Sequence, residues 1–188
     1  VRILLNNPRL TEEHVIKLAS RRPNRAAALV EIGREAVPGL LASVEAQPLA
    51  KLGDDTWQAR CLSDIGLQAV PALATALKVE QASGPAYLAL LGLKNIGAKS
   101  ATARQAILPF LEHEQAAFRG MALAALVAST AKPANLMPRL QSAMNDDNSI
   151  VRQSAMDALA SLGPSARGAT SALVERLGDK DGAIQLSA

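Results

Sequence analysis

The sequence repeats itself with a period of about 33 residues. Five leucines mark the period at spacings of 33, 31, 33 and 33: Leu29, Leu62, Leu93, Leu126 and Leu159. A small residue stands directly before each leucine: Ala28, Cys61, Gly92, Ala125 and Ala158. A period of this length is typical of solenoids, in which each unit buries its apolar face against its neighbours.

Each unit has the pattern of two helices joined by a turn. An apolar residue three positions after the leucine shares its helical face, as Ile65 does with Leu62. Except in the fourth unit, which has Ser129 and Thr130, a glycine then follows that can end the helix with a positive φ: Gly33, Gly66, Gly97 and Gly163.

The second helix opens with proline, which the first helical turn tolerates, at Pro38 and Pro71. In later units Pro109 and Pro138 stand further from the turn, which indicates a longer connection. Pairs four residues apart predict the core side of the second helices: Leu40 with Val44, Leu73 with Leu77, Leu140 with Met144, and Leu173 with Leu177. Links rich in Asp and Asn separate the units, and these side chains can cap the next helix.

These patterns predict an all-α protein, a right-handed α–α superhelix of about five helix pairs. Hydrophobic residues make up 49% of the chain and aromatic residues only 2%, so Leu, Ala, Ile and Val must form the core. We expect a helical lead-in or cap over residues 1–21 and repeats over residues 22–188. The approximate units are 22–51, 52–82, 83–114, 115–147 and 148–180, and a sixth begins at 181–188.

The segment LGPSARGATSALVERLGDKDGAIQLSA, residues 162–188, resembles bacterial HEAT repeats of the phycobilisome-lyase type. In that pattern Ile150-Val151-Arg152 and Phe118-Arg119 occupy the place of a Val-Arg pair after an Asp-rich turn. The resemblance covers about residues 22–188 and implies a HEAT/armadillo-like solenoid. It does not imply one function, because such repeats serve many roles. The first twenty residues resemble a leucine-rich repeat variant unit, although a plain helical continuation of the stack explains them as well.

No residue pattern in the sequence indicates a catalytic site. The two histidines, His14 and His113, stand about three repeats apart and should not meet at one metal. Helical-repeat iron hydroxylases use several His-Glu pairs, whereas this chain has one, at His113-Glu114. Cys61 occupies the interior small-residue column, and the Asp-rich links lack the span and terminal Glu of calcium loops. We therefore expect no catalytic residue, no metal and no cofactor.

The pattern favours a scaffold that binds a protein or peptide along the concave face, formed by the second helices. The candidate contact residues lie between the core anchors: Glu45, Thr75, Lys78, Arg139, Ser142 and Glu175. Their mixed charges favour a protein partner over a polyanion.

The alternative is a DNA-binding or DNA-repair module, since some alkylpurine DNA glycosylases are built from HEAT-like repeats. Its contacts would be basic: Arg21, Arg22, Arg25, Arg119 and Arg152. Few aromatic side chains are present to stack on bases. Arg119 and Arg152 stand one repeat apart, and the sequence favours their pairing with inter-repeat Asp residues over phosphate contacts.

A single cysteine and the lack of a signal or membrane-spanning segment slightly favour a cytoplasmic location. The chain begins at Val1, however, so a targeting segment could precede it. It stops at Ala188, midway through the sixth first helix, and we expect the natural chain to continue.

Overall fold

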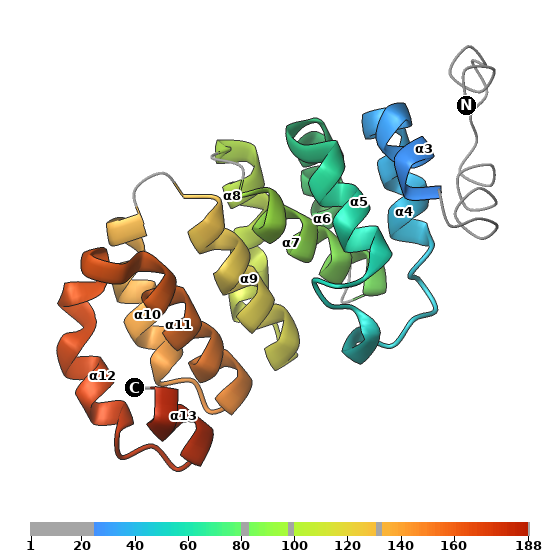
Figure 1. Cartoon of the computed structure of the whole chain (residues 1–188). Coiled ribbons are helices and arrows are strands. Elements are labelled where there is room, and N and C mark those ends of the chain that lie inside the picture. Colours follow the sequence, from blue (N-terminus) through green and yellow to red (C-terminus); the bar gives the residue numbers. More distant parts are fainter. Residues whose placement is uncertain (1–24, 80–82, 98–99, 131–132, 188) are drawn as a thin grey trace.

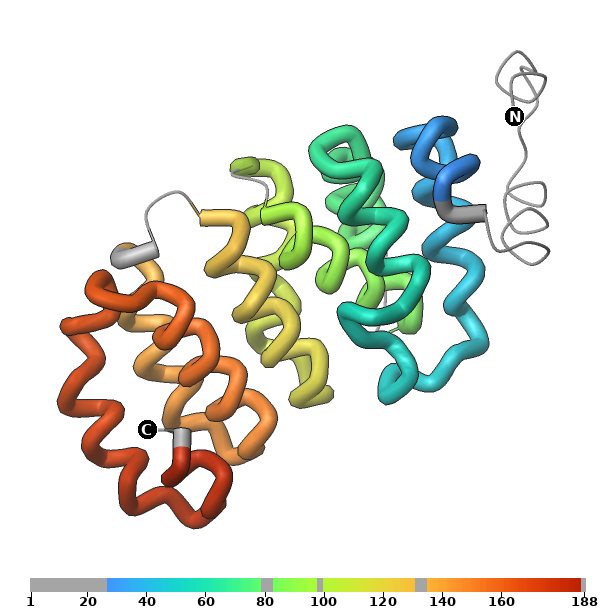
Figure 2. Tube along the Cα trace, viewed as in Figure 1, coloured from blue at the N-terminus to red at the C-terminus, as the bar shows by residue number. Residues whose placement is uncertain are grey.

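The helices form two layers along an elongated stack (Figure 1, Figure 2). The computed structural model describes residues 25–79, 83–97, 100–130 and 133–187, which contain helices and turns but no strand. The first layer consists of α3 (Arg25–Ile32), α5 (Trp57–Ile65), α7 (Gly84–Ile96), α9 (Ala116–Ala128) and α11 (Ser149–Leu162). The second layer consists of α4 (Val37–Ala42), α6 (Val70–Val79), α8 (Ala101–Ile107), α10 (Met137–Met144) and α12 (Thr170–Arg176), and α13 (Gly182–Ser187) follows.

Short 3-10 helices join or extend these elements. They are η1 (Gly33–Ala36), η2 (Leu49–Lys51), η3 (Gly66–Ala69), η4 (Leu108–Glu112), η5 (Pro133–Leu136) and η6 (Gly163–Ala169). Each first-layer helix packs against the next in chain order, and α13 packs against α11. The stack is therefore built from contacts between neighbouring units, as a solenoid requires.

The predicted all-α repeat fold is confirmed. All five period-marking leucines lie in first-layer helices, and none is more than 2% exposed. The small residue before the leucine lies where two units meet: a Cβ on Gly92 would come within 3.0 Å of Leu62 Cδ1 and 3.2 Å of Leu73 Cδ1. Cys61, in the same column, is fully buried as predicted.

The glycine stops are confirmed as well. Gly33, Gly66, Gly97 and Gly163 have φ values of 71°, 66°, 60° and 51°. The fourth unit ends its helix differently, because Ser129 keeps a φ of −86° and the Thr130 hydroxyl donates to the Leu126 carbonyl at 2.7 Å. Ser129 Oγ is buried and lacks a hydrogen-bond partner in the described part of the chain.

Two details of the second layer differ from the expectation. In the third unit, α8 starts directly after Ser100, whose hydroxyl accepts from the Ala103 N–H, so Pro109 lies in η4 beyond the helix. The prediction of Leu177 as a core anchor is wrong, since its side chain is 57% exposed. Its equivalent one repeat earlier, Met144, is 1% exposed, and α10 packs against η6 and α12 of the next unit. No described second-layer helix follows α12 to cover Leu177 in that way.

Replacement of Gly163 by Ala should isolate the cost of the positive φ. A Cβ at Gly163 would meet nothing within 4 Å, so only the backbone conformation opposes the change. Gly163 combines φ 51° with ψ −128°, outside the left-handed α region, so we expect the free energy of unfolding to fall by about 1 to 3 kcal/mol in chemical denaturation. Gly182→Ala is the matched control, because its surroundings are equally open and its φ is not positive. An equal loss in both variants would contradict this account.

Candidate functional site

The six predicted contact residues lie along the second layer. Thr75 and Lys78 are in α6, Arg139 and Ser142 are in α10, Glu175 is in α12, and Glu45 lies in the turn that follows α4. All six side chains are exposed. The structure distributes them over several units and does not gather them into one cluster.

Open grooves run between consecutive elements of this layer. One groove, of about 770 Å³, lies between α4 and α6, and another, of about 540 Å³, lies between η4 and α10. The same four helix positions line both of them: Pro71, Ala72, Thr75 and Ala76 in α6, and Pro138, Arg139, Ser142 and Ala143 in α10. Equivalent repeat positions therefore line a groove in two of the units.

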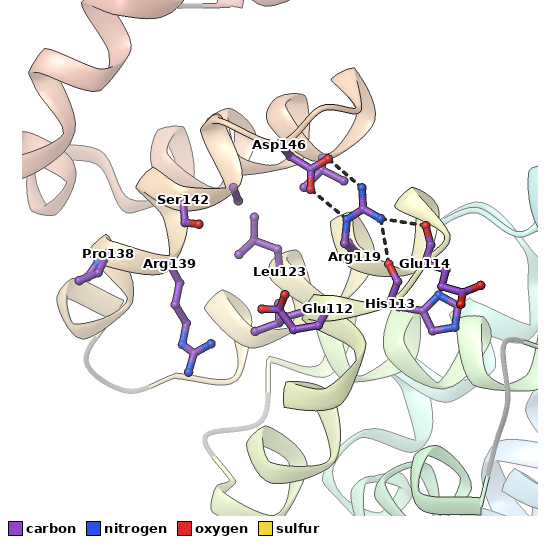
Figure 3. A pocket seen from close by; sticks show the side chains of 12 residues that line it. Glu112, His113, Glu114, Arg119, Leu123, Pro138, Arg139, Ser142 and Asp146 are labelled. Carbon is purple, nitrogen blue, oxygen red and sulfur yellow. Dashed lines mark hydrogen bonds and ion pairs between the residues drawn. The ribbon is translucent and has the colours of Figure 1, made fainter.

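The groove between η4 and α10 has an apolar floor and charged walls (Figure 3). Leu111, Leu123 and Ala143 contribute to the floor. Glu112 stands on the η4 side and Arg139 on the α10 side. Both are exposed, and neither forms an ion pair with another described residue.

An arginine fixes the loop at one end of this groove. Arg119, in the first turn of α9, donates from Nε and Nη2 to the two carboxylate oxygens of Asp146, at 2.9 and 2.7 Å. Its Nη1 donates to the carbonyls of His113 and Glu114, at 2.8 and 2.9 Å (Figure 3). One guanidinium thus joins the loop before its own helix to the loop that follows the same repeat.

Arg152 makes the same contacts one repeat later. Its Nε and Nη2 donate to Asp179 at 2.9 and 2.7 Å, and its Nη1 donates to the carbonyls of Asp146 and Asp147 at 3.0 and 3.1 Å. Both side chains of this pair are only 2% exposed. We call the two arrangements, Arg119 with Asp146 and Arg152 with Asp179, the arginine staples. The predicted pairing of these arginines with inter-repeat aspartates is confirmed.

The staple aspartates also shape their own loops. Asp146 accepts from the Asn148 N–H and Asp179 from the Asp181 N–H, both at 2.9 Å. Asn148 then caps α11 by accepting from the Ile150 N–H at 3.0 Å. Each of these two carboxylates thus holds both an arginine and the turn of its own loop.

Two other residues fill staple positions in part. His113 stands one repeat before Asp146, and its Nδ1 accepts from the Gln115 N–H at 3.0 Å as the aspartates do. Gln185 stands one repeat after Arg152, and its Nε2 donates to the Asp179 carbonyl at 2.6 Å. The 33-residue spacing places Gln185 one step after Arg152 in the sequence, whereas the equivalence of His113 with the staple aspartates was missed although the same spacing contained the signal.

The basic residues of the nucleic-acid alternative receive different placements. Arg21 and Arg22 lie outside the described residues, and so does the side chain of Arg25. Arg119 and Arg152 direct their guanidinium groups to Asp and to backbone carbonyls, and the Arg152 side chain is buried. As placed, Arg152 could reach a phosphate only after breaking its staple.

In the described part of the chain, no group of three or more His, Cys, Asp and Glu residues could hold a metal ion. His14 lies outside that part, and the His113 ring packs against Phe110 and Phe118 at centroid distances of 6.0 and 4.8 Å. Among the described helices, none has the length and apolar character needed to cross a membrane.

Comparison with known proteins places the chain among helical repeat proteins. Residues 105–188 match the family model described as HEAT repeats. No protein of curated function matches the sequence. Among solved structures, a designed armadillo repeat protein in complex with the peptide (KR)4 is similar, with a TM-score of 0.60 and 15% identity over 98% of this chain and 93% of that one.

Two further structures share the fold. The complex of CpcE and CpcF of phycocyanin lyase from Nostoc sp. PCC7120 gives a TM-score of 0.52 and 21% identity, over 97% of this chain and 76% of that one. An engineered protein gives a TM-score of 0.53 and 16% identity, over 98% and 92% of the two chains. Residues 105–188 are therefore similar to HEAT repeats, and the chain as a whole shares the all-α repeat fold of these solved structures.

Removal of the buried staple should destabilise the chain far more than removal of an exposed ion pair. Arg152→Met removes both short hydrogen bonds from Arg152 to the buried Asp179 carboxylate and leaves, of its described ion pairs, only the longer one with Arg176, at 3.4 Å, which is costly in a protein interior. Arg34→Met is the control, because its pair with Glu35 is exposed on both sides, and we expect a change within about 0.5 kcal/mol. Thermal and urea unfolding should show a several-fold larger loss for Arg152→Met, and equal losses would refute the role of the staple.

The staple also predicts a loss of stability in acid. Hydrogen bonds from Arg152 and from the Asp181 N–H hold the pKa of Asp179 below its ordinary value of 3.8. Burial alone would raise the pKa of Asp146, but the hydrogen bonds from Arg119 and the Asn148 N–H outweigh it and lower that pKa too.

Because the folded pKa is the lower one, the stabilisation is complete above about pH 4 to 5 and disappears as the pH falls through the folded value. Urea unfolding between pH 2 and 6 should show this decline. Asp179→Asn should flatten the decline while lowering stability at neutral pH. An unchanged slope in that variant would show that Asp179 is not responsible.

Proposed function

We propose that this chain is a non-catalytic scaffold that binds a protein or peptide partner along its second layer. The observation that carries the proposal is the recurrence of the same groove positions in α6 and α10 on a face whose predicted contact residues are all exposed. A solenoid presents such a face over its whole length. The designed armadillo protein that shares the fold is in complex with a peptide, which supports this mode of use.

The chemistry of the face favours a protein partner over a nucleic acid. Acidic and basic side chains alternate along it, as Glu112, Arg139 and Glu175 do. A polyanion binds instead through a continuous basic surface and releases counterions on binding. The two arginines of that alternative with described side chains, Arg119 and Arg152, are already engaged in staples.

Charge reversal on this face should disrupt partner binding. Proteins captured on the immobilised chain from native extract, with and without nuclease, would be identified, and the complex with one purified partner measured by calorimetry. Arg139→Glu combined with Glu175→Arg keeps the net charge of the chain. Each reversed side chain then faces a charge of its own sign on the partner. We expect about tenfold weaker binding, since like charges across an interface are costly.

The matched control is Arg60→Glu combined with Asp64→Arg, two exposed positions on the first-layer helix α5. It changes the same number of charges on the opposite layer and should leave affinity unchanged. Equal effects of the two variants, or capture that nuclease abolishes, would overturn the proposal.

A further inference from the structure

Exposed charges of opposite sign line the groove between η4 and α10. At one end, Arg119 and Asp146 neutralise each other in a staple, and Glu114 stands there with its carbonyl bound by Arg119. Glu112 and Arg139 are left exposed on facing walls, and neither has an ion-pair partner among the described residues (Figure 3). The floor between them is apolar, with Leu111, Leu123 and Ala143.

The walls of this groove are held in place. The Arg119 staple ties the His113 and Glu114 carbonyls, directly after η4, to Asp146 in the loop that follows α10. Phe110 of η4 is 4% exposed and stacks on Phe118 of α9 at 5.9 Å. A groove with walls fixed in this way loses little conformational entropy when a ligand binds, which favours recognition of a short segment.

The dimensions favour an extended segment over a helix. The groove holds about 540 Å³, within the range of about 300 to 1,000 Å³ that is usual for ligand sites. Neighbouring helix axes in a packed layer lie roughly 8 to 10 Å apart, whereas a helix with its side chains is about 10 to 12 Å wide. An extended chain can therefore enter between two elements of the layer, and a helix would rest on top of them.

We propose that this groove binds an extended segment of the partner in which an apolar residue lies between a basic and an acidic residue. The basic side chain pairs with Glu112, the apolar side chain covers Leu111 and Leu123, and the acidic side chain pairs with Arg139. This inference rests on the proposed function and specifies the chemistry of the partner at one groove. The rival arrangement is a direct pair between Glu112 and Arg139 across the groove, which would leave no charge for a ligand.

Three short peptides test the proposal on the full chain. The probes are acetyl-Gly-Lys-Leu-Glu-Gly-amide and its Lys-Leu-Lys and Glu-Leu-Glu counterparts, titrated into the ¹⁵N-labelled chain while NMR shifts in η4 and α10 are followed. The unaltered chain should prefer Lys-Leu-Glu by about fivefold, as expected for two exposed charge pairs. Replacement of the central Leu by Ser should weaken binding further, because the floor then loses its apolar contact.

Two single variants should shift the peptide preference of the chain in opposite directions. Glu112→Arg makes both walls basic, so the chain should come to prefer Glu-Leu-Glu. Arg139→Glu makes both walls acidic, so it should come to prefer Lys-Leu-Lys. Both residues are exposed, so the fold should persist, and circular dichroism checks this.

One ranking of the three peptides shared by all three proteins would overturn the inference, as would a preference of the unaltered chain for Glu-Leu-Glu. The rival direct pair predicts no preference in the unaltered chain. The proposed function has a separate readout in the calorimetry of the purified partner. The double variant Arg139→Glu and Glu175→Arg could abolish binding of the purified partner while the three peptides do not show the expected preferences. That result would support the proposed scaffold function and contradict the proposed chemistry of this groove.

Discussion

The whole structure depends on how closely one helix pair can approach the next. A single pair of these helices cannot bury its own apolar faces, so it is stable only between neighbours. Small residues at the contact set the distance, and Gly92 shows how tightly, because an added Cβ would press on Leu62 and Leu73 of the preceding unit. Gly120 shows the same in α9, where a Cβ would come within 2.6 Å of Ser154 Oγ in α11. Close approach then buries the leucine columns on both sides.

The features that depend on this local packing could be predicted from the sequence. A leucine that recurs at a fixed period, a small residue before it and a glycine after it each report on one helix and its neighbour. Leu62, Cys61 and Gly66 therefore lie where the pattern placed them. The wrong prediction for Leu177 has the opposite cause. Burial there needs a following second-layer helix, and a repeat pattern cannot show whether that neighbour is in place.

The candidate site depends on longer-range geometry, which the sequence revealed only in part. The pairing of Arg119 and Arg152 with aspartates was predictable, because both arginines and the Asp-rich links recur with the period. Each arginine reaches the aspartate 27 residues further along the chain. This choice depends on how the loop of one repeat lies against the loop of the next. The groove itself was not predictable, since it needs the relative positions of η4 and α10. The expectation that Pro109 marks a longer connection was wrong, and Pro109 instead lies in η4, which forms one wall of the groove.

In the third unit, the residue at the position of the staple aspartate contacts its neighbours through an aromatic ring. His113 occupies the place of a staple aspartate, but the residue one repeat before Arg119 is Ala86, which offers no guanidinium. The imidazole keeps the turn contact to the Gln115 N–H and packs against Phe118, which Tyr87 meets edge-on at 5.6 Å. Apolar ring contacts thus replace a buried ion pair between α7 and α9.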